Sequence, residues 1–93
     1  MHHLRFAYPI RFDDRGGSRV YVSCRDLPEL SMVAVGNLVS ILNIVETALD
    51  DVLEHRLAAG QAVPVPSLKE PDEVLVAPSP AMIAKAAKQL NHE

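Results

Sequence analysis

Carboxylate side chains are the first residues of this chain that could do chemistry. Paired carboxylates can hold a divalent metal ion and so support hydrolysis of a phosphate ester. The carboxylates available for this are those of Asp13, Asp14, Asp26, Glu46, Asp50 and Asp51. The first two precede a pair of glycines, where aspartate serves the backbone of a turn. The last two are adjacent in a helical pattern and point about 100° apart, so they do not converge on one ion.

The remaining nucleophiles and bases also favour a function other than catalysis. Cys24 is the only cysteine and falls on the apolar side of a predicted strand, which predicts a buried, unreactive thiol. His55 lies near the end of a predicted helix, where the helix dipole favours its cation over general-base work. We therefore expect no catalytic residues, no metal site and no cofactor, and we expect that the protein is not an enzyme. A metal-dependent hydrolase that uses Asp13, Asp14 and Asp26 is a third hypothesis, weaker than the other two, which are both binding functions.

Composition indicates one small domain in a reducing compartment. The chain has 93 residues, of which 48% are hydrophobic, and this predicts a single domain over 1–93. A lone cysteine excludes an internal disulfide, so we expect a cytoplasmic protein. No apolar run approaches the roughly 20 residues of a membrane-spanning helix, and no secretory signal is visible. We therefore expect no interaction with a membrane.

The net charge of −3 is distributed unevenly along the chain. Residues 1–25 carry five arginines and two aspartates, a net charge of +3. Residues 26–75 carry nine acidic and two basic side chains, a net charge of −7, and residues 76–93 carry a net charge of +1. One basic and one acidic surface are therefore predicted, and such surfaces steer a protein toward charged partners.

Alternation of apolar and polar residues predicts an antiparallel hairpin at the start of the chain. The runs over 4–12 and 18–25 both have a period of two. The segment between them, Asp13–Gly17, contains two glycines that can adopt positive φ, so we predict a turn there. A third strand is predicted over 30–35 and a fourth over 73–77.

A change of period from 2 to 3.6 predicts a long amphipathic helix over 37–58. Asn37 is a suitable N-cap, and Gly60 is a natural stop. A second helix is predicted over 80–90, where a Ser-Pro pair supplies the cap and the first turn. The apolar residues expected on one face of the long helix are Leu38, Ile41, Leu42, Val45, Leu49, Val52 and Leu53.

These elements together predict the α+β class. We expect one small antiparallel sheet, elements in the order β-β-β-α-β-α, and the long helix packed on one face of the sheet. The side chains at alternate strand positions then face either the helix or the solvent.

One face of the predicted sheet carries basic residues. If the hairpin pairs as predicted, the face away from the helix holds Arg5, Arg11, Arg19 and Tyr21, with Arg25 as a further member. A basic face with an aromatic residue could contact the phosphates of a nucleic acid. Polar outward residues are also normal on a half-exposed sheet, and an isoelectric point near 5.7 argues against a dedicated nucleic-acid binder.

The outer side of the long helix is the second candidate surface. We define the acidic helix face as Asp50, Asp51 and Glu54, with Glu46 at its rim. A basic partner could dock there, although a merely solvated face is the simpler interpretation. Ile44 lies on the same side of the helix among polar residues, as an apolar anchor inside a polar ring would.

The order and spacing of several short motifs resemble the HicB family, the antitoxins of bacterial toxin–antitoxin pairs. The motifs span residues 4 to about 88. They are Tyr8-Pro9-Ile10, the glycine turn, Asp26-Leu27-Pro28, Gly36 before the helix, Pro64-Val65-Pro66-Ser67 and Val74-Leu75-Val76. The helix start, Gly36-Asn37-Leu38, departs from the acidic start that is usual in the family.

The resemblance implies a degenerate ribonuclease H-like fold and a protein partner. That partner would be a HicA-like toxin, a small basic ribonuclease whose RNA-binding surface the antitoxin covers. A homo-dimer or higher oligomer is also expected, and DNA would be bound only through a C-terminal domain that is not evident in this chain. The expected toxin-contact residues are Asp26, Glu29, Ile44, Asp50, Asp51 and Glu54, of which the family motif supports Asp26. The alternative is a nucleic-acid-contacting regulatory module that uses the arginine face.

Overall fold

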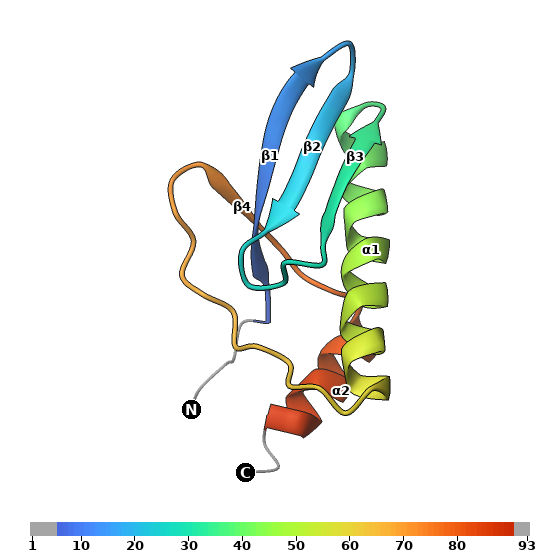
Figure 1. Ribbon diagram of the computed structural model, residues 1–93, viewed down its shortest axis with the longest axis vertical. Coiled ribbons are helices and arrows are strands. Elements are labelled where there is room, and N and C mark those ends of the chain that lie inside the picture. The colour runs from blue at the N-terminus through green and yellow to red at the C-terminus, as the bar shows by residue number, and fades with distance from the viewer. Residues whose placement is uncertain (1–5, 91–93) are drawn as a thin grey trace.

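A four-stranded antiparallel sheet and two helices make up the computed structural model, which describes residues 6–90. The strand order is β3-β2-β1-β4, and both helices lie on the same side of the sheet (Figure 1). The α+β class with a small antiparallel sheet is therefore confirmed. The elements in chain order are β1 (Tyr8–Gly16), β2 (Arg19–Cys24), β3 (Ser31–Val35), α1 (Leu38–Ala58), β4 (Glu73–Val76) and α2 (Pro80–Leu90).

The first hairpin has its first strand shifted along the chain and a tighter turn than predicted. The first strand was expected over 4–12, whose first two residues lie outside the described part, but β1 begins at Tyr8 and continues to Gly16. The turn predicted over Asp13–Gly17 is wrong, because the strands pair as far as Gly16 and Arg19. Only Gly17–Ser18 remain as the connection, with φ of 60° and 63°. Positive φ at both central residues matches the twist of the flanking strands.

Helix α1 begins and ends at the predicted signals. The Asn37 side chain accepts a hydrogen bond from the Ser40 N–H at 2.9 Å, which satisfies one of the free N–H groups of the first turn. Gly60 has a φ of 72°, a conformation that favours glycine after a helix. The buried side chains of α1 are Ile41, Val45, Leu49 and Leu53.

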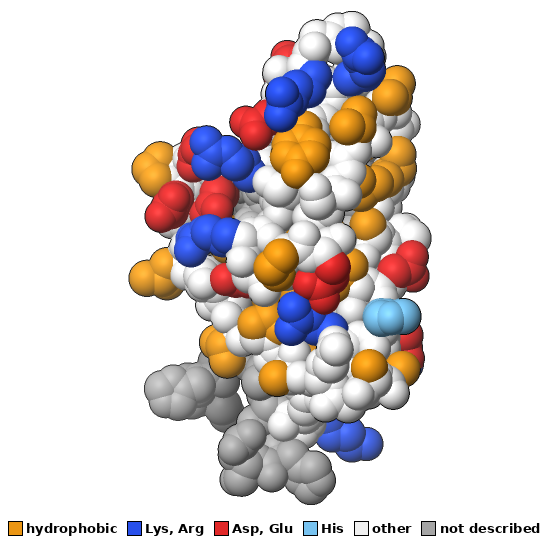
Figure 2. Space-filling view, viewed as in Figure 1, with side chains coloured by type: hydrophobic (Ala, Val, Ile, Leu, Met, Phe, Trp, Pro, Cys, Tyr) orange, Lys and Arg blue, Asp and Glu red, His pale blue; other side chains and the backbone are white. Residues whose placement is uncertain are grey.

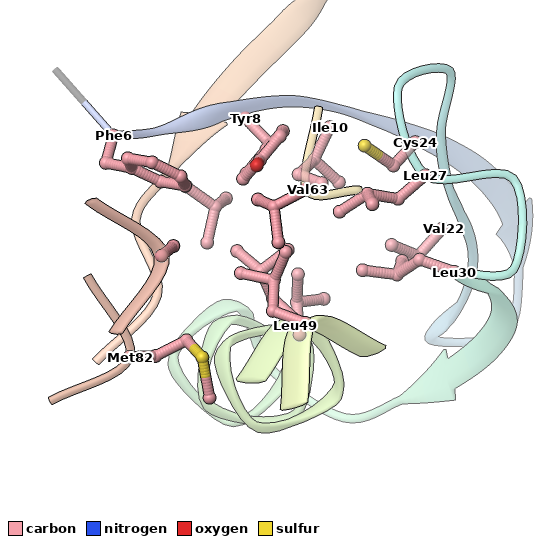
Figure 3. Packing of buried hydrophobic residues seen from close by; sticks show 14 of the residues in the cluster. Phe6, Tyr8, Ile10, Val22, Cys24, Leu27, Leu30, Leu49, Val63 and Met82 are labelled. Atoms are coloured by element: carbon pink, nitrogen blue, oxygen red, sulfur yellow. The ribbon is translucent and has the colours of Figure 1, made fainter. Parts of the chain in front are cut away.

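The core lies between α1 and the sheet, and the chain between α1 and β4 closes one end of it. Figure 3 shows Leu49 facing Val63, which enters from that connecting segment, while Tyr8 and Ile10 come from β1. The rings of Phe6 and Tyr8 meet edge to face with centroids 5.6 Å apart, a favoured aromatic geometry. The core thus joins segments from every part of the described chain.

Leu38 and Leu42, two members of the predicted apolar face, do not belong to the core cluster, and Leu38 is the more exposed of them. The exposed fraction of Leu38 is 68%, so its prediction as a core residue is wrong. It lies at the first position of α1, at the rim of an open hollow of about 300 Å³ between the helix and the sheet. We call this the apolar hollow; its lining residues are Phe12, Val20, Leu38, Ile41, Leu42 and Val74.

The segment 61–72, which we call the strap, has no regular secondary structure but is held at several points. The Tyr8 hydroxyl donates to the Pro64 carbonyl at 2.6 Å. The Val63 N–H donates to the side-chain oxygen of Gln89 in α2 at 2.8 Å. These contacts tie the strap to the sheet at one side and to α2 at the other, so it runs from the end of α1 around to β4 (Figure 1).

Replacing a buried leucine of α1 should destabilise the domain far more than replacing the exposed one. We expect Leu49→Ala to lower the free energy of unfolding by about 2–5 kcal/mol, because it leaves a cavity in the core. The matched control, Leu38→Ala on the same helix, should cost less than about 1 kcal/mol. Urea unfolding followed by circular dichroism measures both, and equal losses would contradict the assigned core.

Candidate protein-interaction surfaces

The arginine face forms on the predicted side of the sheet. In the β1–β2 register Arg11 lies opposite Ser23, and Tyr21 lies opposite Asp13, while the alternate residues enter the core. Arg19 follows the same alternation at the end of β2. Arg5 lies outside the described residues. The hairpin pattern therefore places Arg11, Arg19 and Tyr21 on one side, away from α1.

Acidic side chains neutralise much of that face. Nη2 of Arg11 lies 2.8 Å from Oδ2 of Asp72, and its Nε lies 3.6 Å from Oδ1 of Asp13. The guanidinium of Arg15 lies 5.2 Å from the ring centre of Tyr21, a cation–π distance. Figure 2 shows this side of the molecule, with basic side chains at the hairpin end and acidic ones interleaved with them farther along. The face therefore has mixed charge.

Arg25, the further member of the predicted arginine face, is engaged within the fold. Its Nε and Nη2 donate to the two carboxylate oxygens of Glu73 at 2.9 and 3.1 Å, a bidentate geometry. The Glu70 N–H donates to the same carboxylate at 2.9 Å. These hydrogen bonds, that of Arg25 foremost, hold the pKa of Glu73 below its usual value. Arg25 also donates to the Leu68 carbonyl, so it ties the strap to β2.

Asp26 and Glu29, two predicted toxin contacts in the loop after β2, also have partners inside the chain. Asp26 accepts hydrogen bonds from the N–H and the hydroxyl of Ser67 at 2.8 and 2.6 Å. Glu29 forms a bidentate pair with Arg56 near the end of α1. That guanidinium lowers the pKa of Glu29. Asp26 thereby links the Asp-Leu-Pro turn to the Pro-x-Pro-Ser segment, and Glu29 links it to α1.

The acidic helix face exists, but some of its carboxylates already have partners. Oδ1 of Asp50 accepts from the Ser79 N–H at 2.8 Å, next to the start of α2. Glu54 pairs with Lys85 of α2 at 2.9 Å, and both side chains are more than half exposed. A pair so exposed contributes little to stability and exchanges readily for another partner. Glu46 is exposed, with no ion pair among residues 6–90.

The six predicted contact residues do not form one patch, because those on α1 lie on two different sides of that helix. On the α2 side, Asp50 lines an open hollow of about 370 Å³ with Glu46 and the link from β4 to α2. We call this the acidic hollow. On the β3 side, Ile44 and Asp51 line another hollow, of about 420 Å³, which also involves Met32 of β3. We call this the β3-side hollow.

The candidate metal ligands and the single thiol can be located among the described residues. Among them, no three histidine, cysteine or acidic side chains gather as metal ligands. Cys24 is buried, and desolvation raises the pKa of its thiol, which disfavours the nucleophilic thiolate. In the same part of the chain, neither helix has the length and apolar character needed to cross a membrane.

Several residues that shape these surfaces were not identified from the sequence. Met32 joins Ile44 in the β3-side hollow, and Lys85 reaches across from α2 to Glu54. Ser79 was identified only as a helix cap, yet it also donates to Asp50. These contacts join residues far apart in the chain, so local periodicity carries no signal for them. The pair Glu54 and Lys85 could have been suggested only by knowing that α2 packs beside α1, which was not predicted from the sequence.

No protein-family model and no curated protein matches this sequence.

The bidentate pair of Arg25 and Glu73 should make stability depend on acid pH. The pKa of Glu73 is lower in the folded chain than the ordinary glutamate value of about 4.3. Its stabilisation is therefore complete above about pH 5 and is lost as the pH falls through the folded pKa, below about pH 4. We expect Glu73→Gln to unfold at a lower urea concentration than the wild type at pH 7. The variant should also lose less stability than the wild type as the pH falls from about 5 to about 3.

The exposed Glu46 supplies the control for that experiment. Glu46→Gln should leave the dependence of the unfolding midpoint on pH as in the wild type. Superimposable wild-type and Glu73→Gln curves between about pH 3 and pH 7 would show that the pair contributes nothing.

Proposed function

We propose that this protein is an antitoxin that binds and neutralises a small basic ribonuclease of the HicA type. The observation that carries the proposal is the acidic hollow, where Glu46 and Asp50 line an open space of about 370 Å³ between α1 and the β4–α2 link. A lysine or arginine side chain of a basic partner fits such a space by size and by charge. The motifs that resemble the HicB family supply the identity of the partner class.

The outer side of α1 suits a basic surface electrostatically. Glu46, Asp50 and Glu54 lie within nine residues of one helix, and among residues 6–90 the one ion pair that these three make is that of Glu54 with Lys85. Glu46, Asp50 and Glu54 recur every four residues, which aligns them along one side of the helix. An arginine of a partner that replaces Lys85 at Glu54 loses little, because the existing pair is solvent-exposed.

Inhibition by this route would be steric and electrostatic. An RNA-cleaving protein must present a basic surface to its substrate, since phosphate contacts dominate its affinity for nucleic acid. A rigid helix with a row of carboxylates competes for that surface and excludes RNA while bound. The antitoxin then needs no chemistry of its own, in keeping with how its carboxylates serve the fold.

The test is inhibition of a purified small basic ribonuclease of the HicA type. We expect the purified chain to suppress cleavage of a defined RNA transcript by that protein. The double variant Glu46→Lys and Glu54→Lys should weaken the inhibition by at least tenfold, because it reverses two charges that face the partner. Asp50 is left unchanged because it holds the start of α2.

Glu70→Lys is the matched control, since Glu70 is exposed on the strap and away from α1. It should inhibit as the wild type does. Equal inhibition by the double variant and the control, with both folded by circular dichroism, would remove the acidic helix face from the mechanism. Salt-dependent binding of RNA by the isolated chain would instead favour the arginine face as the functional surface.

A further inference from the structure

Strand β3 is an edge strand without the usual protection. It pairs with β2 alone among the described strands. Its sequence, Ser31–Val35, contains no charged residue and no proline, although charges, prolines and bulges are the features that keep edge strands from pairing with another chain. Val33 and Val35 expose 57% and 59% of their surfaces. The edge is therefore open, apolar and ready to accept a further strand.

The backbone pattern shows which groups of β3 are free to pair. The Gly36 N–H donates to the Ser18 carbonyl at 3.2 Å, one step beyond the last β2–β3 partners. Because hydrogen-bonded and non-hydrogen-bonded pairs alternate in an antiparallel ladder, every second residue of β3 then turns its N–H and C=O away from β2. Those residues are Ser31, Val33 and Val35.

We propose that β3 pairs with β3 of a second copy of this chain, antiparallel and about a two-fold axis at Val33. In this register Val33 exchanges both backbone hydrogen bonds with its own counterpart, and Ser31 does so with Val35 of the other copy. All the outward N–H and C=O groups of β3 are then satisfied. A shift in either direction leaves some of them unpaired, so the strand specifies its own register. The two sheets would join into one of eight strands.

The surface beside β3 fits the same symmetry. The β3-side hollow brings Met32, the neighbour of Val33 in β3, next to Ile44 of α1, so Ile44 lies on the flank of the molecule that a second copy would meet. The hollows of the two copies then face each other, and the Met32, Ile44 and Ala48 side chains of their linings pack together. This gives Ile44 the role of an apolar anchor at the centre of an isologous interface.

The charges along α1 are complementary across that axis. In antiparallel helices centred on Ile44, Asp51 lies seven residues from the centre and faces Asn37 of the second copy, seven residues on the other side. The first turn of α1 contains no acidic residue, and the positive end of a helix dipole attracts a carboxylate. Like charges do not meet, because β3 is neutral and the two copies of Asp51 lie on opposite sides of the axis. A second copy therefore suits this edge better than a basic partner does.

The test is the mass of the chain in solution. Sedimentation equilibrium at about 100 μM should give twice the 10.2 kDa of one chain. Val33→Lys should reduce the mass to that of one chain, because it places a charge on the axis. Val65→Lys is the matched control, since Val65 is an equally exposed valine on the strap, and it should leave the mass doubled.

A cysteine at the axis provides a second readout that does not depend on destabilising the edge. Hydrogen-bonded antiparallel partners have Cα atoms about 5.5 Å apart, within the range of a disulfide. Val33→Cys should therefore form a covalent dimer on mild oxidation, whereas Val65→Cys should not, and the buried native Cys24 should stay reduced. A monomeric wild type, or a Val33→Cys variant that does not cross-link, overturns the proposal.

Two further outcomes separate this proposal from the toxin-binding proposal. The Glu46→Lys and Glu54→Lys variant should remain a dimer, because both residues lie away from the β3 flank. A monomeric wild type whose β3 edge is covered only when the small basic protein binds would overturn self-pairing in favour of strand addition by that partner.

Discussion

The fold depends on one contact layer, the apolar stripe of α1 against one face of the sheet. Ile41, Val45, Leu49 and Leu53 recur with helical spacing and are buried, while the sheet offers alternate residues of β1 and β2 to meet them. A four-stranded sheet with one covered face leaves its other face and its edges exposed. The surfaces available for partners are consequences of that one-sided packing.

Many polar side chains that could have served a partner serve the strap. Asp26, Glu73, Arg25 and Tyr8 all hold segment 61–72 or the residue that follows it. The strap has little regular structure and few buried side chains, Val63 among them, so specific hydrogen bonds replace the missing packing. Two of the carboxylates of the chain, those of Asp26 and Glu73, are therefore engaged within the fold, whereas those of Glu46 and Asp51 on α1 have no hydrogen bond or ion pair among residues 6–90.

Local sequence patterns predicted the helices and strands well, but they could not predict the contacts between these elements. Period two and period 3.6 placed the strands and α1, and Asn37 and Gly60 marked the ends of that helix, because each signal acts within a few residues. The hairpin turn was misplaced because the pairing of the strands, and not the glycine content, fixes its length. The two flanks of α1 could not be told apart, since the neighbours of Ile44 and Asp50 depend on strand order and on the position of α2. Leu38 was misassigned because periodicity does not reveal where the sheet stops covering the helix.

The buried position of Cys24 has a consequence for the chemical durability of the molecule. The chain has one cysteine, and its sulfur is enclosed by the core with a pKa raised by burial. Alkylating reagents and peroxides act on exposed thiolates, so they reach this sulfur only when the domain opens. The rate at which a thiol reagent labels the native protein therefore reports how often the domain opens far enough to expose Cys24. During oxidative episodes in a cell the same enclosure would spare the molecule from sulfenic acid formation and from mixed disulfides with glutathione.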